Sequence, residues 1–142
     1  NLVNQFSIKM TNKSKKILSE ISAGELLDKI SILEIKLKKI EDENNREEIK
    51  KEYKILKEIQ NSSIKFDDKI KELFNSIKVI NIKLWNVEDD LRVCEKNKDF
   101  GKNFIELARE VYFNNDKRSK IKSEINKILG SNIREVKQYV NY

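Results

Sequence analysis

The sequence contains no histidine. That absence excludes the common zinc sites, the Ser-His and Cys-His nucleophile pairs, and acid–base catalysis by imidazole. Catalysis by this chain would have to rely on carboxylates, lysine, arginine or tyrosine. Mg²⁺ suits oxygen-rich sites of that kind, so it is the metal that we would expect under catalysis.

Proline is also absent, and the 142 residues include three glycines. Few positions can therefore interrupt a helix, whereas strong helix formers such as lysine, glutamate and leucine are abundant. The length suits one domain with a hydrophobic core of its own. The composition therefore predicts an all-α fold.

Cys94 is the only cysteine, which excludes a disulfide within the chain and fits a reducing compartment. No apolar run approaches the ~20 residues needed to span a bilayer, and the N-terminal residues contain no signal-peptide core. We therefore expect a cytoplasmic location and no membrane span.

Charged residues make up 38% of the chain, and the formal net charge is +6. Lysine and glutamate are interleaved along the expected helices, as in residues 47–52, which indicates solvated helix faces. Nucleic-acid binding usually shows clustered arginine with interleaved aromatic residues, and that pattern is missing. The densest basic group lies near the N-terminus and consists of Lys9, Lys13, Lys15 and Lys16. We therefore do not expect a nucleic-acid partner.

Apolar residues recur at spacings of three and four through most of the chain, as on one face of a helix. The spacing predicts four helices, at about 22–41, 46–60, 66–97 and 102–129. Ser22 and Glu25 have the spacing of a capping box at the start of the first helix, and Gly130 suits the C′ position of the last. Residues 43–45, Glu-Asn-Asn, are expected to form the turn after the first helix.

These helices predict an antiparallel helical bundle in which a long hairpin, 66–97 and 102–129, packs with two shorter helices. The bundle domain spans 22–130, with a flexible or extended segment at 1–21 and a C-terminal tail at 131–142. The third helix has the longest apolar run, more than three heptads, so we expect it to be the backbone of the fold.

The fourth helix carries two polar residues, Asn114 and Arg118, in the middle of its apolar face. One interpretation is a break at 114–116 that gives two short helices. The other is a single long helix with polar groups in its core. We favour the long helix because neither glycine nor proline is present to break it.

Asn81, Trp85, Glu88 and Arg92 form a second stripe beside the apolar face of the third helix, because they are spaced by four, three and four. In an antiparallel hairpin with its turn near residues 99–100, this stripe meets the polar interruption of the fourth helix, with Asn81 beside Arg118 and Glu88 one turn away. A buried charge needs a partner, so Glu88 is expected to pair with Arg118.

That level of the hairpin has two interpretations. It can be a sealed ion pair that fixes the register of the helices, which we favour, or a pocket for a small anion or nucleotide. The candidate ligand-binding residues are Asn81, Trp85, Glu88, Arg92, Asn115, Arg118 and Lys122. Glu25 and Asp28, in E-x-x-D spacing, are candidate Mg²⁺ ligands together with Asp89.

Four blocks of sequence stand out: GELLDKISILEIKL (24–37), LWNVEDDLR (84–92), DFGKNFIELAREVYFNND (99–116) followed by Arg118, and IKSEINKILGS (121–131). In this order they resemble a bacterial family of short helical proteins that is recorded as a domain of unknown function. The resemblance covers about 19–139. It implies no activity, but its members' occurrence near surface-carbohydrate and glycosyltransferase genes implies an accessory role in surface-carbohydrate biosynthesis.

Two classes of function fit these observations. The first is a non-enzymatic helical interaction module without a cofactor, which binds a partner protein or pairs with itself as a homodimer. The alternative is an Mg²⁺-dependent helical hydrolase, or a binder of a nucleotide or another phosphorylated small molecule, with Arg118 and Lys122 on the phosphate. A helical pocket for a dicarboxylate, as in chorismate mutases, is a third hypothesis.

Overall fold

The computed structural model describes residues 16–142, and all regular secondary structure in that part of the chain is helical. The four described helices are α2 (Ala23–Lys39), α3 (Glu43–Ser63), α4 (Asp68–Lys96) and α5 (Lys102–Ile128). The all-α prediction is therefore confirmed, and each predicted helix has a counterpart in the structure.

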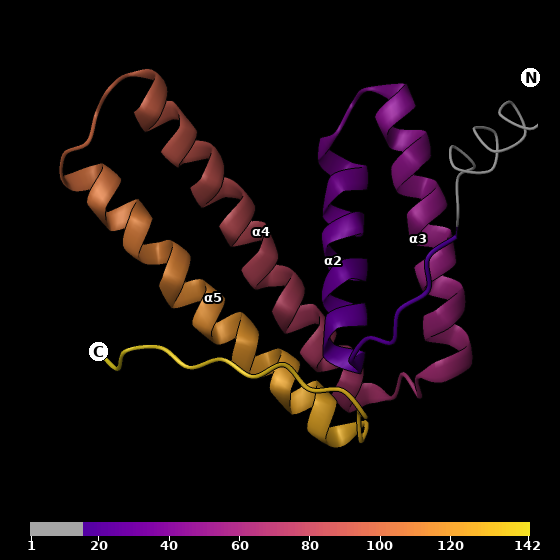
Figure 1. Ribbon diagram of the computed structural model, residues 1–142. Coiled ribbons are helices and arrows are strands. Elements are labelled where there is room, and N and C mark those ends of the chain that lie inside the picture. Colours follow the sequence, from indigo (N-terminus) through magenta and orange to yellow (C-terminus); the bar gives the residue numbers. More distant parts are fainter. Residues whose placement is uncertain (1–15) are drawn as a thin grey trace, which may run out of the picture.

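The helices form two antiparallel hairpins, α2–α3 and α4–α5, which meet at one end and separate at the other (Figure 1). Both hairpin turns lie at the separated end. The C-terminal tail, residues 131–142, leaves the joined end and runs back along α5 without forming a helix. The molecule therefore has the shape of a fork with two helical arms.

Helix α2 is the centre of this fork, because it packs against α3, α4 and α5. Helix α3 packs against α2 alone among the described helices. Helix α4, which we expected to be the backbone of the fold, packs against α2 and, more extensively, against α5. Helix α2 is shorter, but eight of its 17 residues are buried.

The hydrophobic core lies where the hairpins join. Leu27 and Ile30 of α2, Ile70 of α4 and Ile125 of α5 are each 0% exposed. Full burial of such a side chain contributes about 1.5–3 kcal/mol. This end of the fork therefore holds the hairpins together.

Three helices start at side-chain caps. Ser22, Asp42 and Asp67 each accept a hydrogen bond from the backbone N–H three residues later, at 2.9–3.1 Å. The Asp42 cap starts α3 at Glu43, so the predicted turn at residues 43–45 was wrong. The turn is shorter because Nη1 of Arg46 donates to the carbonyl groups of Leu37 and Ile40, which ties the end of α2 to the start of α3.

Helix α5 continues without a break through residues 114–116, as predicted. Asn114 is 2% exposed, and its Nδ2 donates to the backbone oxygen and to Oε2 of Glu110, at 2.7 and 2.9 Å. The buried amide is therefore satisfied within its own helix, and no kink is needed. Gly130 follows α5 with a φ of 62°, which confirms its C′ role.

Most of the predicted flexible or extended N-terminal segment, residues 1–15, lies outside the described residues. Lys9, Lys13 and Lys15 of the basic group lie there as well. Residues 16–22 precede α2 without regular secondary structure. Of the helices that the structure describes, none is both long enough and apolar enough to cross a membrane.

Candidate functional site

The start of α2 lies directly against α5 because residue 24 is a glycine. A Cβ atom at Gly24 would be 2.6 Å from the backbone oxygen of Lys122 and 2.9 Å from Oδ1 of Asn126. The N–H of Gly24 donates to that same Oδ1 at 2.7 Å, and the N–H of Ala23 donates to Oγ of Ser131 at 3.1 Å. Side chains from the end of α5 and from the tail therefore complete the capping that Ser22 begins.

One turn further along α2, this close packing brings a carboxylate between α4 and α5. The Asp28 side chain is 1% exposed. Its Oδ1 accepts hydrogen bonds from Nδ2 of Asn81 and from Nε of Arg118, both at 2.9 Å, and its Oδ2 accepts from Nη2 of Arg118 at 2.5 Å. The Asn81 amide also donates to Oγ of Ser31 at 2.8 Å. Asp28, Ser31, Asn81 and Arg118 form a buried network with contributions from three helices, which we call the Asp28 network.

The predicted pair between Glu88 and Arg118 was wrong. Glu88 pairs with Arg92 on its own helix at 2.9 Å, whereas Arg118 binds Asp28. The register of the hairpin was right, because Asn81 and Arg118 meet at the same carboxylate. The error arose because that carboxylate belongs to α2, which the pairwise alignment of α4 and α5 did not include.

Lys122 extends the charge cluster toward the tail. Its Nζ lies 2.7 Å from Oε2 of Glu25, 3.1 Å from Oε2 of Glu135 and 4.0 Å from Oδ2 of Asp28. Burial lowers the pKa of Lys122, but the hydrogen bonds to Glu25 and Glu135 and the negative charges of Glu25 and Asp28 together outweigh it, and the net shift is upward. The hydrogen bond to Asp28 likewise raises the pKa of Arg118. Both cations are therefore held charged by carboxylates already present.

This arrangement bears on the proposed Mg²⁺ ligands. The ammonium group of Lys122 lies between the carboxylates of Glu25 and Asp28. Asp89 is on another helix, α4, where it lines the groove described below. Among residues 16–142, no group of three or more Asp, Glu or Cys side chains is placed to hold a metal ion. The geometry of the described residues therefore gives the Mg²⁺ hypothesis no support.

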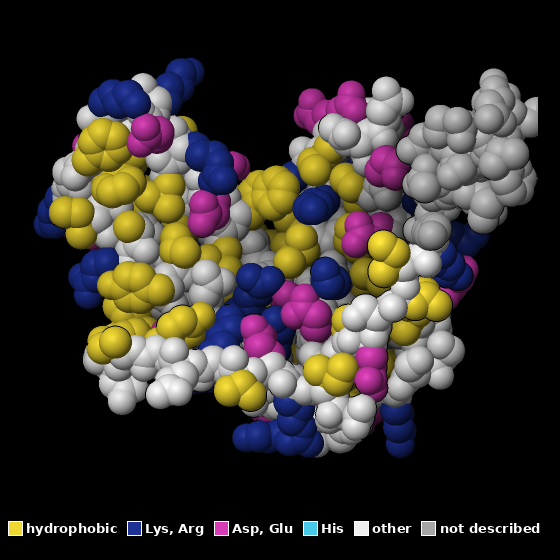
Figure 2. Space-filling view, viewed as in Figure 1, with side chains coloured by type: hydrophobic (Ala, Val, Ile, Leu, Met, Phe, Trp, Pro, Cys, Tyr) yellow, Lys and Arg dark blue, Asp and Glu magenta, His cyan; other side chains and the backbone are white. Residues whose placement is uncertain are grey.

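The hollow of the fork is a groove beside the Asp28 network, with a cavity volume of about 320 Å³. We call it the fork groove. Its lining combines apolar side chains with polar ones, and consists of Ile32, Ile35, Asn81, Leu84, Trp85, Glu88, Asp89, Arg92 and Arg118. Figure 2 shows hydrophobic and charged side chains meeting in the hollow between the hairpins. Two carboxylates and two guanidinium groups line the groove, so its charges balance.

Five of the seven candidate ligand-binding residues line the fork groove; Asn115 and Lys122 do not. Asn115 accepts a 3.4 Å hydrogen bond from Nη1 of Arg118 through Oδ1, on the far side of the guanidinium. Asp89, the candidate Mg²⁺ ligand on α4, also lines the groove. The periodicity of the sequence therefore predicted the residues that α4 contributes to the groove. It did not predict the residues that α2 contributes, Ile32 and Ile35.

A comparison with protein-family models places the chain in a family. A family model described as "Family of unknown function (DUF6165)" matches residues 17–141. The chain belongs to this family. The matched range includes all four sequence blocks, so the predicted resemblance to a domain of unknown function is confirmed. No curated protein and no solved structure matches the chain.

Proposed function

We propose that the protein is a non-enzymatic helical interaction module, and that its fork groove binds a helix from a second copy of the chain. One observation carries the proposal: Leu84 and Trp85 of α4 and Ile32 and Ile35 of α2 line the same groove, and Trp85 and Ile32 are half-buried there. Tryptophan and arginine are enriched among the residues that dominate binding at interfaces. A groove of about 320 Å³ is also suited to anchor one or two apolar side chains of a helix.

The charges of the groove favour a protein ligand over a phosphate. Arg118 is bound by Asp28, and Arg92 is paired with Glu88 at 2.9 Å. The groove therefore has no excess positive charge to offer an anion. Its polar rim and apolar walls resemble the usual composition of a protein interface.

The far end of the α4–α5 hairpin suggests why the second polypeptide is another copy of this chain. Figure 1 shows this end standing apart from α2 and α3. It exposes apolar side chains that no described helix covers, with exposed fractions of 55% for Val93, 49% for Phe100 and 55% for Ile105. Exposed apolar surface of this kind often marks an interaction site. A twofold dimer with each arm in the fork of the other copy would bury it.

The test uses Trp85, which is the only tryptophan and lines the groove. Analytical ultracentrifugation over a concentration series is expected to show a monomer–dimer equilibrium. The emission of Trp85 is expected to shift to shorter wavelength over the same range, because the indole loses water contact. Ile32→Lys, in the groove, is expected to weaken the dimer at least tenfold.

Val79→Lys is the matched control. Val79 also lies on α4 and is 66% exposed, but it is outside the groove, so the same added charge is expected to leave the dimer unchanged. Circular dichroism of both variants checks that they fold. A monomer at the highest concentration reached would contradict the proposal, and so would an Ile32→Lys dimer of unchanged affinity.

A further inference from the structure

A second hollow lies between α5 and the C-terminal tail, with a cavity volume of about 880 Å³. Ligand pockets for small molecules usually measure roughly 300–1,000 Å³. The tail is held beside α5 at its far end, where the Tyr142 hydroxyl donates to Asp116 and the Tyr142 ring packs 5.4 Å from the ring of Phe113. We call this hollow the tail pocket. It is distinct from the fork groove, and the two share no lining residue.

The tail pocket has an excess of positive charge. Four lysines and two carboxylates line it. Lys83 is neutralised by Glu110 at 2.9 Å, and Lys137 lies 3.5 Å from Glu135. Lys117 and Lys120 form no ion pair with any residue in the described part of the chain. These two ammonium groups on α5 are therefore available to an anionic ligand.

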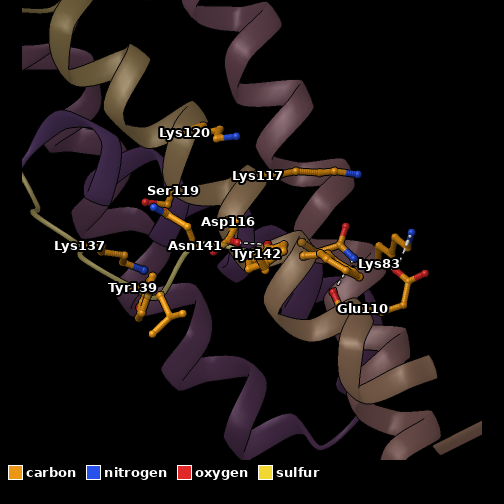
Figure 3. A pocket seen from close by; sticks show the side chains of 13 residues that line it. Lys83, Glu110, Asp116, Lys117, Ser119, Lys120, Lys137, Tyr139, Asn141 and Tyr142 are labelled. Carbon is orange, nitrogen blue, oxygen red and sulfur yellow. Dashed lines mark hydrogen bonds and ion pairs between the residues drawn. The ribbon is translucent and has the colours of Figure 1, made fainter. Parts of the chain in front are cut away.

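Uncharged groups complete the lining. Figure 3 shows Ser119 on α5 beside Asn141 of the tail, with Tyr139 and Tyr142 around the same space. A serine hydroxyl and an asparagine amide can both donate hydrogen bonds to phosphate oxygens. Tyrosine rings offer flat faces on which a base or a sugar ring can stack. The pocket thus places anion-binding groups within one hollow with aromatic surfaces.

We propose that the tail pocket binds a small molecule with a phosphate ester on a ring, the phosphate between Lys117 and Lys120 and the ring against Tyr139. A nucleotide and a sugar phosphate share this chemistry. This site differs from the anion site predicted at Arg118 and Lys122, because both of those cations are bound by carboxylates. The proposal does not depend on the fork groove or on a dimer.

Isothermal titration calorimetry of the full chain tests the site with three probes: AMP, glucose 6-phosphate and inorganic pyrophosphate. At least one of the two ring-bearing probes is expected to bind at millimolar concentration or better. Lys120→Ala is expected to weaken this binding at least fivefold, and Lys117→Ala similarly. Lys120→Arg keeps the charge and is expected to retain most of the affinity. The relative affinity for AMP and glucose 6-phosphate then separates the two ligand sources.

Lys127→Ala is the matched control, since Lys127 is an exposed lysine of α5 that does not line the pocket. It removes the same net charge and is expected to leave binding unchanged. Tyr139→Ala is expected to weaken AMP or glucose 6-phosphate but not pyrophosphate.

Three results would overturn the proposal. One is the absence of binding by all three probes. A second is an equal loss in Lys127→Ala and Lys120→Ala, which would reduce the effect to general charge attraction. The third is a Tyr139→Ala variant with unchanged affinity for every probe, which would show that the ring of the ligand does not pack against Tyr139.

Discussion

Replacing Arg118 with alanine tests whether the Asp28 network is a buried ion pair on which the fold depends. The Asp28 side chain is 1% exposed and accepts two of its three hydrogen bonds from the guanidinium. Without Arg118, the carboxylate keeps the Asn81 amide as a donor and has the Lys122 ammonium 4.0 Å away. Breaking a buried pair from one side costs about 3–5 kcal/mol. Arg118 is 27% exposed and Lys122 can approach, so we expect the lower end, about 3 kcal/mol of unfolding free energy.

Urea unfolding followed by circular dichroism measures this loss, and Arg92→Ala is the matched control. Arg92 also pairs with a carboxylate, at 2.9 Å, but its side chain is 72% exposed. An exposed pair contributes about 0.2–1 kcal/mol. Equal losses in the two variants would refute the reasoning. A loss below about 1 kcal/mol in Arg118→Ala would do the same, because it would place the pair among exposed ones.

A double variant separates the contribution of the ion pair from that of the volume its side chains fill. Asp28→Leu combined with Arg118→Leu is expected to recover most of the loss, because replacing a whole buried pair by apolar groups is often neutral or stabilising. The Asn81 amide keeps an acceptor in Ser31 Oγ, at 2.8 Å. The same urea unfolding experiment measures this recovery.

Three further predictions concern the start of α2 and the contact between α5 and the tail. Gly24→Ala is expected to destabilise the fold by about 1–3 kcal/mol in urea unfolding, because a backbone oxygen 2.6 Å from the new Cβ outweighs the gain of about 1 kcal/mol in helix propensity. Ser22→Ala is expected to cost about 1 kcal/mol in the same assay through loss of the N-cap, and no measurable loss would contradict that role. The hydrogen bond to Asp116 raises the pKa of Tyr142 from its ordinary value of 10.0. The stabilisation of the fold by this hydrogen bond is therefore complete below pH 10.0, and it is lost as the pH rises through the raised pKa. Asp116→Asn is expected to lower this pKa in an ultraviolet pH titration referenced to Tyr142→Phe.

The periodicity of the sequence was enough to predict the helices and the register of the α4–α5 hairpin. It placed Asn81 level with Arg118, and both side chains do bind the same atom, Oδ1 of Asp28. Periodicity could not predict which element enters between two paired helices. Asp28 has the spacing of a metal ligand, and only its 1% exposure between α4 and α5 shows that it is a structural anion.

Contacts between residues far apart in the chain were beyond prediction for a related reason. Gly24 and Asn126 are 102 positions apart, and their hydrogen bond depends on how closely two helices pack. Gly24, at the second position of its helix, could have indicated such close packing, because glycine has a low helix propensity and its presence in a helix often has a packing reason. The tail pocket gave no such signal, because it forms only when the tail lies along α5.

Helix α5 serves both proposed sites, and the geometry of a helix keeps them separate. Successive residues are rotated by about 100° around the helix axis. Lys117 and Arg118 are neighbours in sequence, yet Lys117 lines the tail pocket and Arg118 lines the fork groove. Lys117→Ala removes no contact of the Asp28 network, whereas Arg118→Ala removes the charge partner of a buried carboxylate. If Lys117→Ala weakens a phosphorylated probe while the dimer and the unfolding free energy stay unchanged, the two faces of α5 act independently.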